Sequence, residues 1–308
     1  MTPSRVIWLD GEFVPWEEAK VHVLSHALHY GSGVFEGIRA YPTDRGPAVF
    51  RLTEHMERLV RGCKAYGIPL DRTADELVDI AVSVVRENDL DEGCYIRPLA
   101  FLGLGSIGLN PAGAATHFMV AAWEWGAYLG EDGVRNGIRG RFSSWRRIDQ
   151  ASLIPSAKGT GAYLNSILAK SEAVNAGYDE AIMLNTQGYI SEGSGENVFV
   201  IKDGVVSTPP VSDGCLNGIT RDTAMTLLRA GDVEVREQSL TRASLYYADE
   251  VFLVGTAAEV TPLREVDDRP IGTGKPGPIT QMVQDSYADV VRGKVPEYDH
   301  WLTYVKDA

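Results

Sequence analysis

The chain has 308 residues, of which 44% are hydrophobic and 23% charged, so it suits one large or two medium globular domains. Its formal net charge of −13 argues against nucleic acid or an anionic membrane as a partner, because both bind clustered cations. The three cysteines lack metal-type spacing, and the sequence shows neither an export signal nor a run of about 18 apolar residues. These features predict a cytoplasmic protein without a metal.

The first part of the chain, residues 1–124, predicts a small domain that mixes strands with helices. Thr73 and Glu76 form a capping box, which is typical of a helix start, and apolar residues then recur at helical spacing. The expected elements are strands at residues 6–9, 13–15, 95–102 and 117–123 and helices within residues 56–66 and 73–85.

Residues 125–136 are rich in glycine and lack periodicity, which predicts a loop between two domains. The remaining residues, 137–308, again mix strands with helices and form the larger predicted domain. Its expected elements are helices near residues 162–176, 221–230 and 278–292 and short strands at residues 181–184, 189–190, 197–201 and 250–253. The predicted fold class is therefore α+β with two domains.

Lys158 lies among small uncharged residues just before an apolar helical run. A lysine that is kept from water can lose its proton and attack a carbonyl, which gives a Schiff base with substrates or with pyridoxal phosphate. A surface lysine in a glycine-rich loop fits the same residues, so the local sequence leaves both interpretations open.

Two glycine-rich segments are candidates for ligand contact through the backbone. Gly218 and Thr220 precede an apolar helix, whose exposed N–H groups could hold a phosphate, although Thr220 could instead cap that helix. Small residues follow the strand that ends near Gly255, where a ligand could approach backbone amides. A tight strand–turn junction would explain the same residues.

Charged side chains add candidate partners for an ionic ligand. Glu192, among glycines, could face a protonated pyridine ring, or it could belong to a solvated bulge. Tyr95 and Arg97 alternate on one face of a strand, and Arg58 lies beside the apolar stripe of its helix. Each arginine could bind an anion or form a salt bridge. Together these sites supply what a pyridoxal phosphate enzyme needs.

From about residue 6 to residue 292 the sequence resembles the branched-chain amino acid aminotransferases, which belong to the fold type IV group of pyridoxal phosphate enzymes. Many motifs match in family order. They are His29-Tyr30-Gly31, Val34-Phe35-Glu36-Gly37-Ile38-Arg39, Glu54-His55-Met56-Glu57-Arg58-Leu59, Tyr95-Ile96-Arg97-Pro98-Leu99, the Lys158 segment, the run from Gly188 to Asn197, Gly218-Ile219-Thr220-Arg221 and Gly255-Thr256-Ala257-Ala258-Glu259.

The resemblance implies the fold type IV architecture, with the active site between the domains, and a role for each matching cofactor residue. Lys158 is expected to bind the cofactor as a Schiff base and to carry a proton, and Glu192 to pair with the pyridine nitrogen. The other expected cofactor-binding residues are Arg58, Tyr163, Gly195, Ile219, Thr220 and Thr256.

For the substrate, the resemblance implies ping-pong transamination between leucine, isoleucine or valine and 2-oxoglutarate. Tyr95 and the amides of Thr256 and Ala257 are expected to receive the α-carboxylate, and Arg97 the distal carboxylate. The other expected substrate-binding residues are Tyr30, Phe35, Arg39, Leu109, Trp125 and Tyr128. A homodimer or higher homo-oligomer is implied, because in this family the loop around Leu109 reaches the neighbouring subunit.

The sequence departs from the family pattern at two positions. Asn217 replaces a usual proline in the phosphate loop, and Leu109 replaces a common valine, which bears on substrate preference. Alternative functions are a D-amino acid or (R)-amine transaminase of the same fold, and a non-catalytic protein that binds pyridoxal phosphate. The Tyr95 and Arg97 pair favours a branched-chain aminotransferase over a D-amino acid or (R)-amine transaminase. Intact Lys158 and Glu192 favour it over a non-catalytic protein.

Overall fold

The computed structural model describes residues 2–105, 108–126 and 130–306, and the chain folds into two compact units. The first unit contains the residues up to 125 together with residues 157–162 and those from 289 onward. The second contains residues 126–156 and 163–288. Residues 157–162 and the C-terminal residues thus pack with the first unit, although both fall inside the range 137–308 of the larger predicted domain.

The first unit is built on a sheet with the strand order β17-β5-β4-β6-β7-β1-β2, in which β3 also pairs with β6. Its strands are β1 (Val6–Leu9), β2 (Glu12–Pro15), β3 (Gly33–Phe35), β4 (Ile38–Thr43), β5 (Gly46–Phe50), β6 (Cys94–Leu102), β7 (Thr116–Trp123) and β17 (Leu302–Tyr304). Its helices and 3-10 turns are η1 (Trp16–Glu18), α1 (His26–Tyr30), α2 (Leu52–Ala65), α3 (Ala74–Glu87), η3 (Thr160–Ala162) and η5 (Pro296–Trp301).

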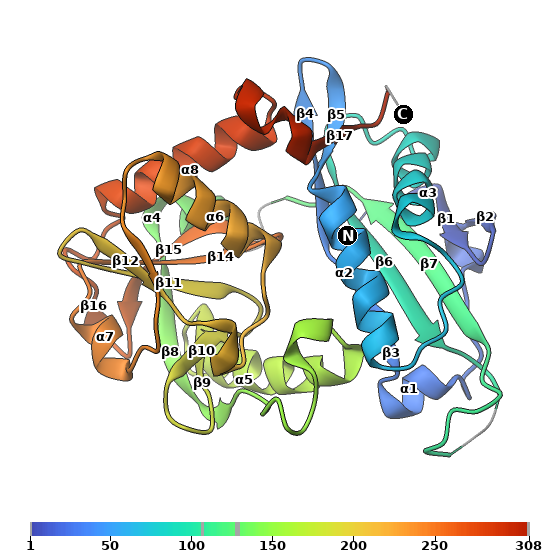
Figure 1. The fold of residues 1–308 in the computed structure, drawn as a ribbon, viewed down its shortest axis with the longest axis horizontal. Coiled ribbons are helices and arrows are strands. Elements are labelled where there is room, and N and C mark those ends of the chain that lie inside the picture. Colours follow the sequence, from blue (N-terminus) through green and yellow to red (C-terminus); the bar gives the residue numbers. More distant parts are fainter. Residues whose placement is uncertain (1, 106–107, 127–129, 307–308) are drawn as a thin grey trace. The chain divides into compact units, whose positions relative to one another are not determined.

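Helices α2 and α3 cover one face of this sheet (Figure 1). Leu52, Met56 and Leu59 recur at helical spacing on α2 and are fully buried, so the apolar stripe seen in the sequence is the face that packs on the sheet. The capping box predicted at Thr73 and Glu76 is present at the start of α3. The core of the unit therefore lies between these two helices and strands β6 and β7.

The second unit is built on a sheet with the order β10-β9-β8-β15-β14-β11-β12-β13, with β16 beside β15. Its strands are β8 (Ile138–Arg146), β9 (Glu180–Leu184), β10 (Ile190–Gly193), β11 (Asn197–Lys202), β12 (Val205–Thr208), β13 (Val235–Glu237), β14 (Glu250–Gly255), β15 (Glu259–Val266) and β16 (Arg269–Pro270). Its helices and 3-10 turns are α4 (Gly130–Asn136), α5 (Tyr163–Asn175), α6 (Ile219–Ala230), α7 (Arg242–Tyr246) and η4 (Val211–Asp213). Two further elements, η2 (Pro155–Ala157) and α8 (Pro278–Val291), contain residues of both units.

Both units combine helices with sheet, so the predicted α+β class is confirmed. The structure also differs from the prediction in places. Helix α4 lies inside the range predicted as a loop, where Asn136 donates to Asp132 one turn earlier at 2.6 Å and Gln284 donates to the carbonyl of Val134. The hairpin of β4 and β5 is absent from the prediction, because its strands are short and contain prolines.

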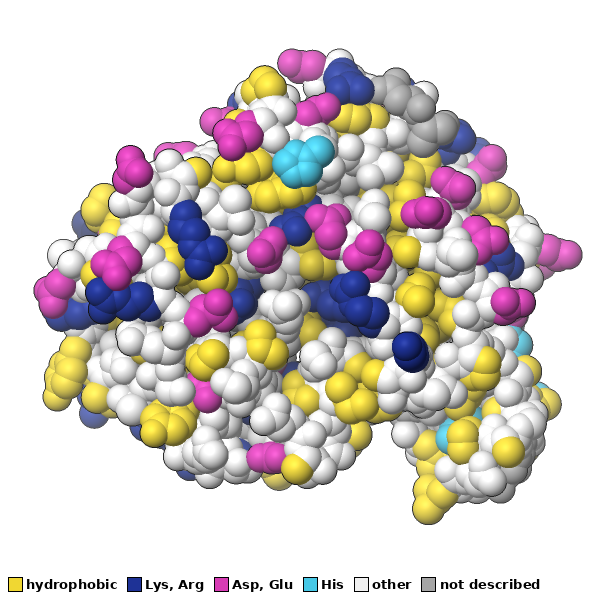
Figure 2. Space-filling model, in the orientation of Figure 1, with side chains coloured by type: hydrophobic (Ala, Val, Ile, Leu, Met, Phe, Trp, Pro, Cys, Tyr) yellow, Lys and Arg dark blue, Asp and Glu magenta, His cyan; other side chains and the backbone are white. Residues whose placement is uncertain are grey.

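No helix in the described residues is long and apolar enough to cross a bilayer. On the face shown in Figure 2, acidic and basic side chains are interspersed, with apolar side chains between them. This face therefore presents no extended field of a single charge.

Candidate active site

Lys158 lies in the segment of residues 157–162 that packs with the first unit. Its φ of +42° is in the left-handed region, which residues other than glycine seldom adopt. Its carbonyl accepts the N–H of Phe35 at 3.3 Å, and the neighbouring Gly159 forms a β-bridge with Val34. The side chain is half-buried, with Nζ 5.3 Å from the centre of the Phe35 ring. The alternative of an exposed surface lysine does not fit this arrangement.

Arg97 joins Lys158 at the same aromatic ring. Its guanidinium carbon lies 4.8 Å from the centre of the Phe35 ring, and Nη2 donates to the hydroxyl of Tyr95 at 3.1 Å. Tyr95 and Arg97 therefore share one face of β6, as their alternation predicts. Among the described residues, Nε of Arg97 is buried without a hydrogen-bond partner. Because buried N–H groups are nearly always paired, this one suits an anionic ligand.

A glycine, Gly37, and an aromatic residue, Trp125, shape the space around Tyr95. A Cβ on Gly37 would lie 2.0 Å from the Tyr95 hydroxyl, so only glycine leaves the phenol its place. The Trp125 ring meets the Tyr95 ring edge-on, with 4.5 Å between centroids. Arg39, opposite Tyr95 in the sheet, donates to the carbonyl of Trp125 at 3.0 Å. Arg39 thus supports the wall of this space through Trp125.

The remaining expected substrate residues are more exposed than Tyr95 or lie outside the described residues. Tyr30 ends α1, is 43% exposed and has its ring centre 4.6 Å from that of His26. Leu109 is 87% exposed. Tyr128 lies outside the described residues. The roles of all three remain predictions.

Arg58 on α2 is buried against the carboxylate of Glu36. Its Nε donates to Oε1 at 2.6 Å and its Nη2 to Oε2 at 2.8 Å. Nδ1 of His55 lies 2.7 Å from the same Oε2. Burial alone would raise the pKa of Glu36, but the charge of Arg58 and these hydrogen bonds outweigh it and hold the pKa well below its usual range. Arg58 therefore forms the salt bridge through the Nε–Nη2 edge of its guanidinium, and its expected contact with a phosphate stays a prediction.

In the second unit, Glu192 is only 5% exposed, so the alternative of a solvated bulge is wrong, although the pairing of β10 with β9 does contain a register shift beside it. Its Oε2 accepts the N–H of Leu216 at 3.0 Å. Its Oε1 lies 2.7 Å from Nε of Arg147, but that N–H does not point at the oxygen, so the contact is an ion pair and not a hydrogen bond. The carboxylate thus keeps lone pairs for a further donor.

The turn that follows Glu192 is held by two more buried carboxylates. Glu180 accepts the N–H of Ser194 at 3.3 Å and pairs with Lys170 at 2.5 Å, and Glu196 accepts the N–H of Gly195 at 3.1 Å. Burial, together with the charge of Glu180, raises the pKa of Glu196 to about 8. Glu196 is therefore largely protonated at neutral pH.

Helix α6 begins at Ile219 and has Gly218 as its N-cap residue, without a side-chain hydrogen bond to the cap. Thr220 lies inside the first turn, so the alternative in which Thr220 caps the helix is wrong. A Cβ on Gly218 would lie 2.1 Å from Oδ1 of Asn197, which excludes any larger residue there. N–H groups in the first turn of a helix are of the kind that binds an anion.

Asn197 also connects these segments, because it donates to the carbonyl of Leu216 at 2.9 Å and pairs with Val254 in the sheet. Strand β14 ends at Gly255, where a Cβ would lie 3.3 Å from the carbonyl oxygen of Gly195. The tight strand–turn junction that the sequence offered as an alternative is therefore present at residues 256–258. It lies beside the turn that contains Gly195. Tyr163 is the half-buried first residue of α5.

No role was expected from the sequence for Glu36, His55, Arg147 or Leu216. Glu36 and His55 appeared only inside motifs. The spacing could have pointed to His55, because residues 55 and 58 are three apart and share one face of a helix. Arg147 follows β8, and its contact with Glu192 depends on which strands pair. No local pattern reveals that pairing.

Comparison with known proteins agrees with this geometry. Residues 33–266 match the model of the family described as amino-transferase class IV. A branched-chain-amino-acid aminotransferase of Pseudomonas aeruginosa is 49% identical over 301 residues, which are 98% of this chain and 97% of that protein. The crystal structure of the Escherichia coli branched-chain amino acid aminotransferase has a TM-score of 0.96 at 48% identity and covers 98% of this chain and 99% of its own.

The branched-chain amino acid aminotransferase of Thermobaculum terrenum, solved in its PLP-form, has a TM-score of 0.92 at 36% identity, covering 98% of this chain and 99% of that one. The chain belongs to the amino-transferase class IV family. The family and the fold predicted from the sequence are thereby confirmed.

Proposed function

We propose that the protein is a pyridoxal phosphate-dependent aminotransferase that moves amino groups between branched-chain L-amino acids and 2-oxoglutarate. The observation that carries the proposal is the buried Nε of Arg97, which has no hydrogen-bond partner among the described residues and lies at the ring that Lys158 also approaches. A reactive amine beside an anion-binding guanidinium suits a substrate that carries a carboxylate. The names of the relatives supply the branched-chain specificity.

The residues present fit pyridoxal phosphate. Glu192 is a buried carboxylate with spare acceptor capacity, which suits a protonated pyridine nitrogen. The start of α6 at Ile219 and Thr220, which lacks a side-chain cap, suits a phosphate, as does the buried guanidinium of Arg58. We assign Tyr163, Gly195 and Thr256 to the same cofactor. When bound, this cofactor supplies an electron sink for the electrons of the bond broken at the substrate Cα.

The chain's own residues then have distinct tasks. Lys158 attaches the cofactor through Nζ and carries the proton that leaves and rejoins the substrate carbon. Tyr95 orients the α-carboxylate with the amides of Thr256 and Ala257, and Arg97 binds the distal carboxylate of 2-oxoglutarate. An apolar side chain instead lies along Phe35 and Trp125, so one space accepts both substrate types.

The decisive experiment is a donor and acceptor panel with the purified protein loaded with pyridoxal phosphate. L-Leucine, L-isoleucine and L-valine should react with 2-oxoglutarate, while D-alanine and (R)-1-phenylethylamine should react far more slowly. Activity with only the last two would replace this proposal by the D-amino acid or (R)-amine transaminase. A protein that stays colourless after incubation with pyridoxal phosphate would contradict any function of this class.

Replacing Lys158 separates catalysis from binding. Lys158→Ala should reduce turnover by at least about 10⁴-fold, because the nucleophile and the proton carrier are both lost. It should still bind pyridoxal phosphate through the phosphate. Lys64→Ala on α2 is the matched control, because that lysine is exposed. A Lys158→Ala variant that retains full turnover would exclude the assigned role.

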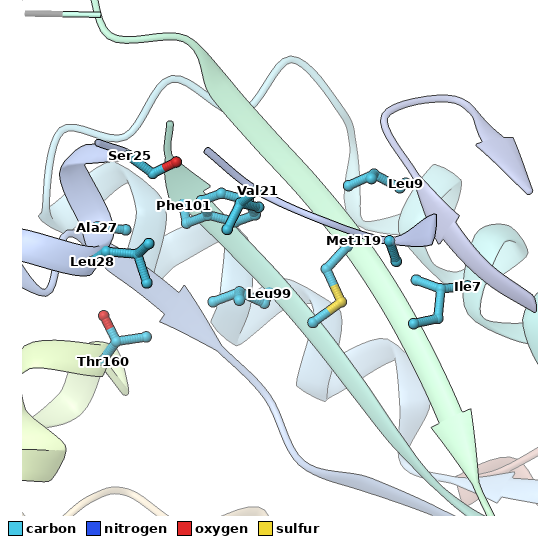
Figure 3. A pocket seen from close by; sticks show the side chains of 11 residues that line it. Ile7, Leu9, Val21, Ser25, Ala27, Leu28, Leu99, Phe101, Met119 and Thr160 are labelled. Atoms are coloured by element: carbon cyan, nitrogen blue, oxygen red, sulfur yellow. The ribbon is translucent and has the colours of Figure 1, made fainter. Parts of the chain in front are cut away.

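We further infer that two copies of the chain associate. The pocket shown in Figure 3 has a volume of about 380 Å³ and lies in the first unit, where apolar side chains of β1, β6 and β7 meet residues 19–28. Leu28, at its edge, is 62% exposed, and Val23 is 72% exposed. In the second unit, Leu164 and Ile167 share the exposed face of α5. Such apolar surface is typical of an interface, and a second copy is the occupant we propose.

Analytical ultracentrifugation tests the association. The protein should sediment as a dimer or a larger assembly, and Leu28→Asp should shift it toward monomer, whereas Glu57→Gln on the exposed side of α2 should not. A monomeric wild-type protein at micromolar concentration would contradict the inference.

The three cysteines are buried and free, which supports the reducing cytoplasm as the compartment of the protein.

A further inference from the structure

Glu36 is a fully buried carboxylate to which the proposed function gives no task. It occupies the Nε–Nη2 edge of the Arg58 guanidinium, with both contacts shorter than 3 Å. An arginine has a second edge, made by Nη1 and the other N–H of Nη2. With the first edge fixed by Glu36, the direction of the second edge is fixed as well.

His55 restrains the same carboxylate from one helical turn before Arg58. Burial lowers the pKa of His55, the carboxylate of Glu36 opposes this, and the charges of Arg58 and Lys158 add to the lowering. The net lowering of the pKa favours the uncharged ring. Since an ionised carboxylate only accepts, Nδ1 of His55 must carry the proton and donate it to Oε2. The ring thus orients the carboxylate of Glu36.

The backbone of Glu36 is equally constrained. Its N–H donates to the carbonyl of Pro98 at 3.0 Å, and the preceding residue, Phe35, donates to the carbonyl of Lys158. Glu36 thus directly follows β3, and the last residue of that strand contacts the backbone of the reactive lysine. Glu36 links the expected phosphate ligand on α2 to the backbone that positions Lys158.

We propose that Glu36, oriented by His55, is a positioning residue that aims the Arg58 guanidinium at the 5'-phosphate of the cofactor. The proposal rests on the assignment of Arg58 to the phosphate in the proposed function. Its consequence is that affinity for the phosphate depends on the geometry of a carboxylate that itself repels the phosphate.

Charge and geometry make opposite predictions for Glu36→Gln. If only charge mattered, removing a buried anion would strengthen binding of a dianionic phosphate. If positioning dominates, the amide NH2 group would face the N–H groups of the Arg58 guanidinium and displace it. Binding of the phosphate would then weaken. Partners that orient a ligand-binding group commonly contribute tenfold or more to affinity. The sign of the change therefore decides between the two explanations.

The experiment measures dissociation constants of the apoenzyme for pyridoxal phosphate and for pyridoxal, which lacks the phosphate. In Glu36→Gln the preference for pyridoxal phosphate over pyridoxal should fall by about tenfold. Glu36→Asp keeps the charge but reaches about 1.5 Å less far. It should show the same loss, with pyridoxal affinity unchanged in both variants. A variant that merely misfolds would lose both ligands together.

Two controls separate the possible failures. Glu57→Gln breaks an exposed pair with Arg61 on the same helix and should leave the preference unchanged. In an Arg58→Ala background, Glu36→Gln should have no further effect, because the group that it aims is absent. If the wild type shows no preference for pyridoxal phosphate, the assignment of Arg58 is wrong. If the wild type shows it and Glu36→Gln retains or increases it, the positioning role alone is overturned.

Discussion

Two buried glutamates, one in each unit, face an arginine in different ways. Glu36 accepts two hydrogen bonds from Arg58 and one from His55, which hold its pKa below the usual range. Glu192 has an ion pair with its arginine and one hydrogen bond from a backbone amide.

The difference shows that residue type and burial do not define a role. A carboxylate whose oxygens are already occupied by side-chain donors can orient those donors, whereas one with spare lone pairs can accept a ligand. Glu196 is a third case, since burial and the neighbouring charge of Glu180 outweigh its backbone hydrogen bond and raise its pKa.

The strongest test of this comparison is the loss of Glu36. Glu36→Ala leaves the guanidinium of Arg58 buried without its carboxylate, and the free energy of unfolding should decrease by about 3–5 kcal/mol. Urea denaturation of the apoenzyme measures this change. A decrease below about 1 kcal/mol would mean that water replaces the carboxylate and that the pair is not a constraint.

Glu192→Gln should affect turnover more than stability. The amide cannot hold a proton on the pyridine nitrogen, so the electron sink weakens and kcat with L-leucine should fall by about 100-fold or more. Affinity for pyridoxal phosphate should change by less than tenfold. Steady-state kinetics at saturating cofactor give the first value and fluorescence titration the second. The reverse pattern would assign Glu192 an anchoring role like that of Glu36.

Glu196 should make stability depend on pH. Its folded pKa of about 8 lies above the unfolded value of 4.5, so the folded state binds the additional proton between these values. The free energy of unfolding should therefore fall as pH rises from about 5 to 8, by up to about 1.4 kcal/mol per pH unit. In Glu196→Gln this contribution to the slope should disappear. Equal slopes in the two proteins would show that Glu196 ionises normally.

The smallest effect is expected at an exposed glutamate–arginine pair. Glu57 and Arg61 lie 3.2 Å apart on the surface of α2. Glu57→Gln should reduce the free energy of unfolding by no more than about 0.5 kcal/mol, because water screens the pair. If Glu57→Gln reduced the free energy of unfolding as much as Glu36→Ala does, burial would not explain why the two glutamate–arginine pairs differ.

The sequence predicted those features that depend on local spacing. The shared face of Tyr95 and Arg97 follows from strand alternation, and the capping box at Thr73 follows from four consecutive residues. The family resemblance supplied Lys158 and Glu192 with their roles, and those roles remain proposals until the variants are measured.

Features that depend on distant pairing could not be predicted. The contact of Arg147 with Glu192 needs the order of β8, β9 and β10, and the contact of Glu36 with Arg58 needs β3 to lie against α2. The segment of Lys158 is likewise held by the bridge between Val34 and Gly159, which are 125 positions apart in the sequence. Such contacts appear only when the chain has folded.

The division of the chain into units has a consequence for its synthesis. Strand β17, near the C-terminus, pairs with β5 at the edge of the first sheet, and residues 157–162 also pack with that unit. A nascent chain that has left the ribosome only through residue 125 therefore presents β5 as an open edge. The first unit to be translated is among the last to be completed, and until then that edge is a place where a chaperone or another nascent chain can pair.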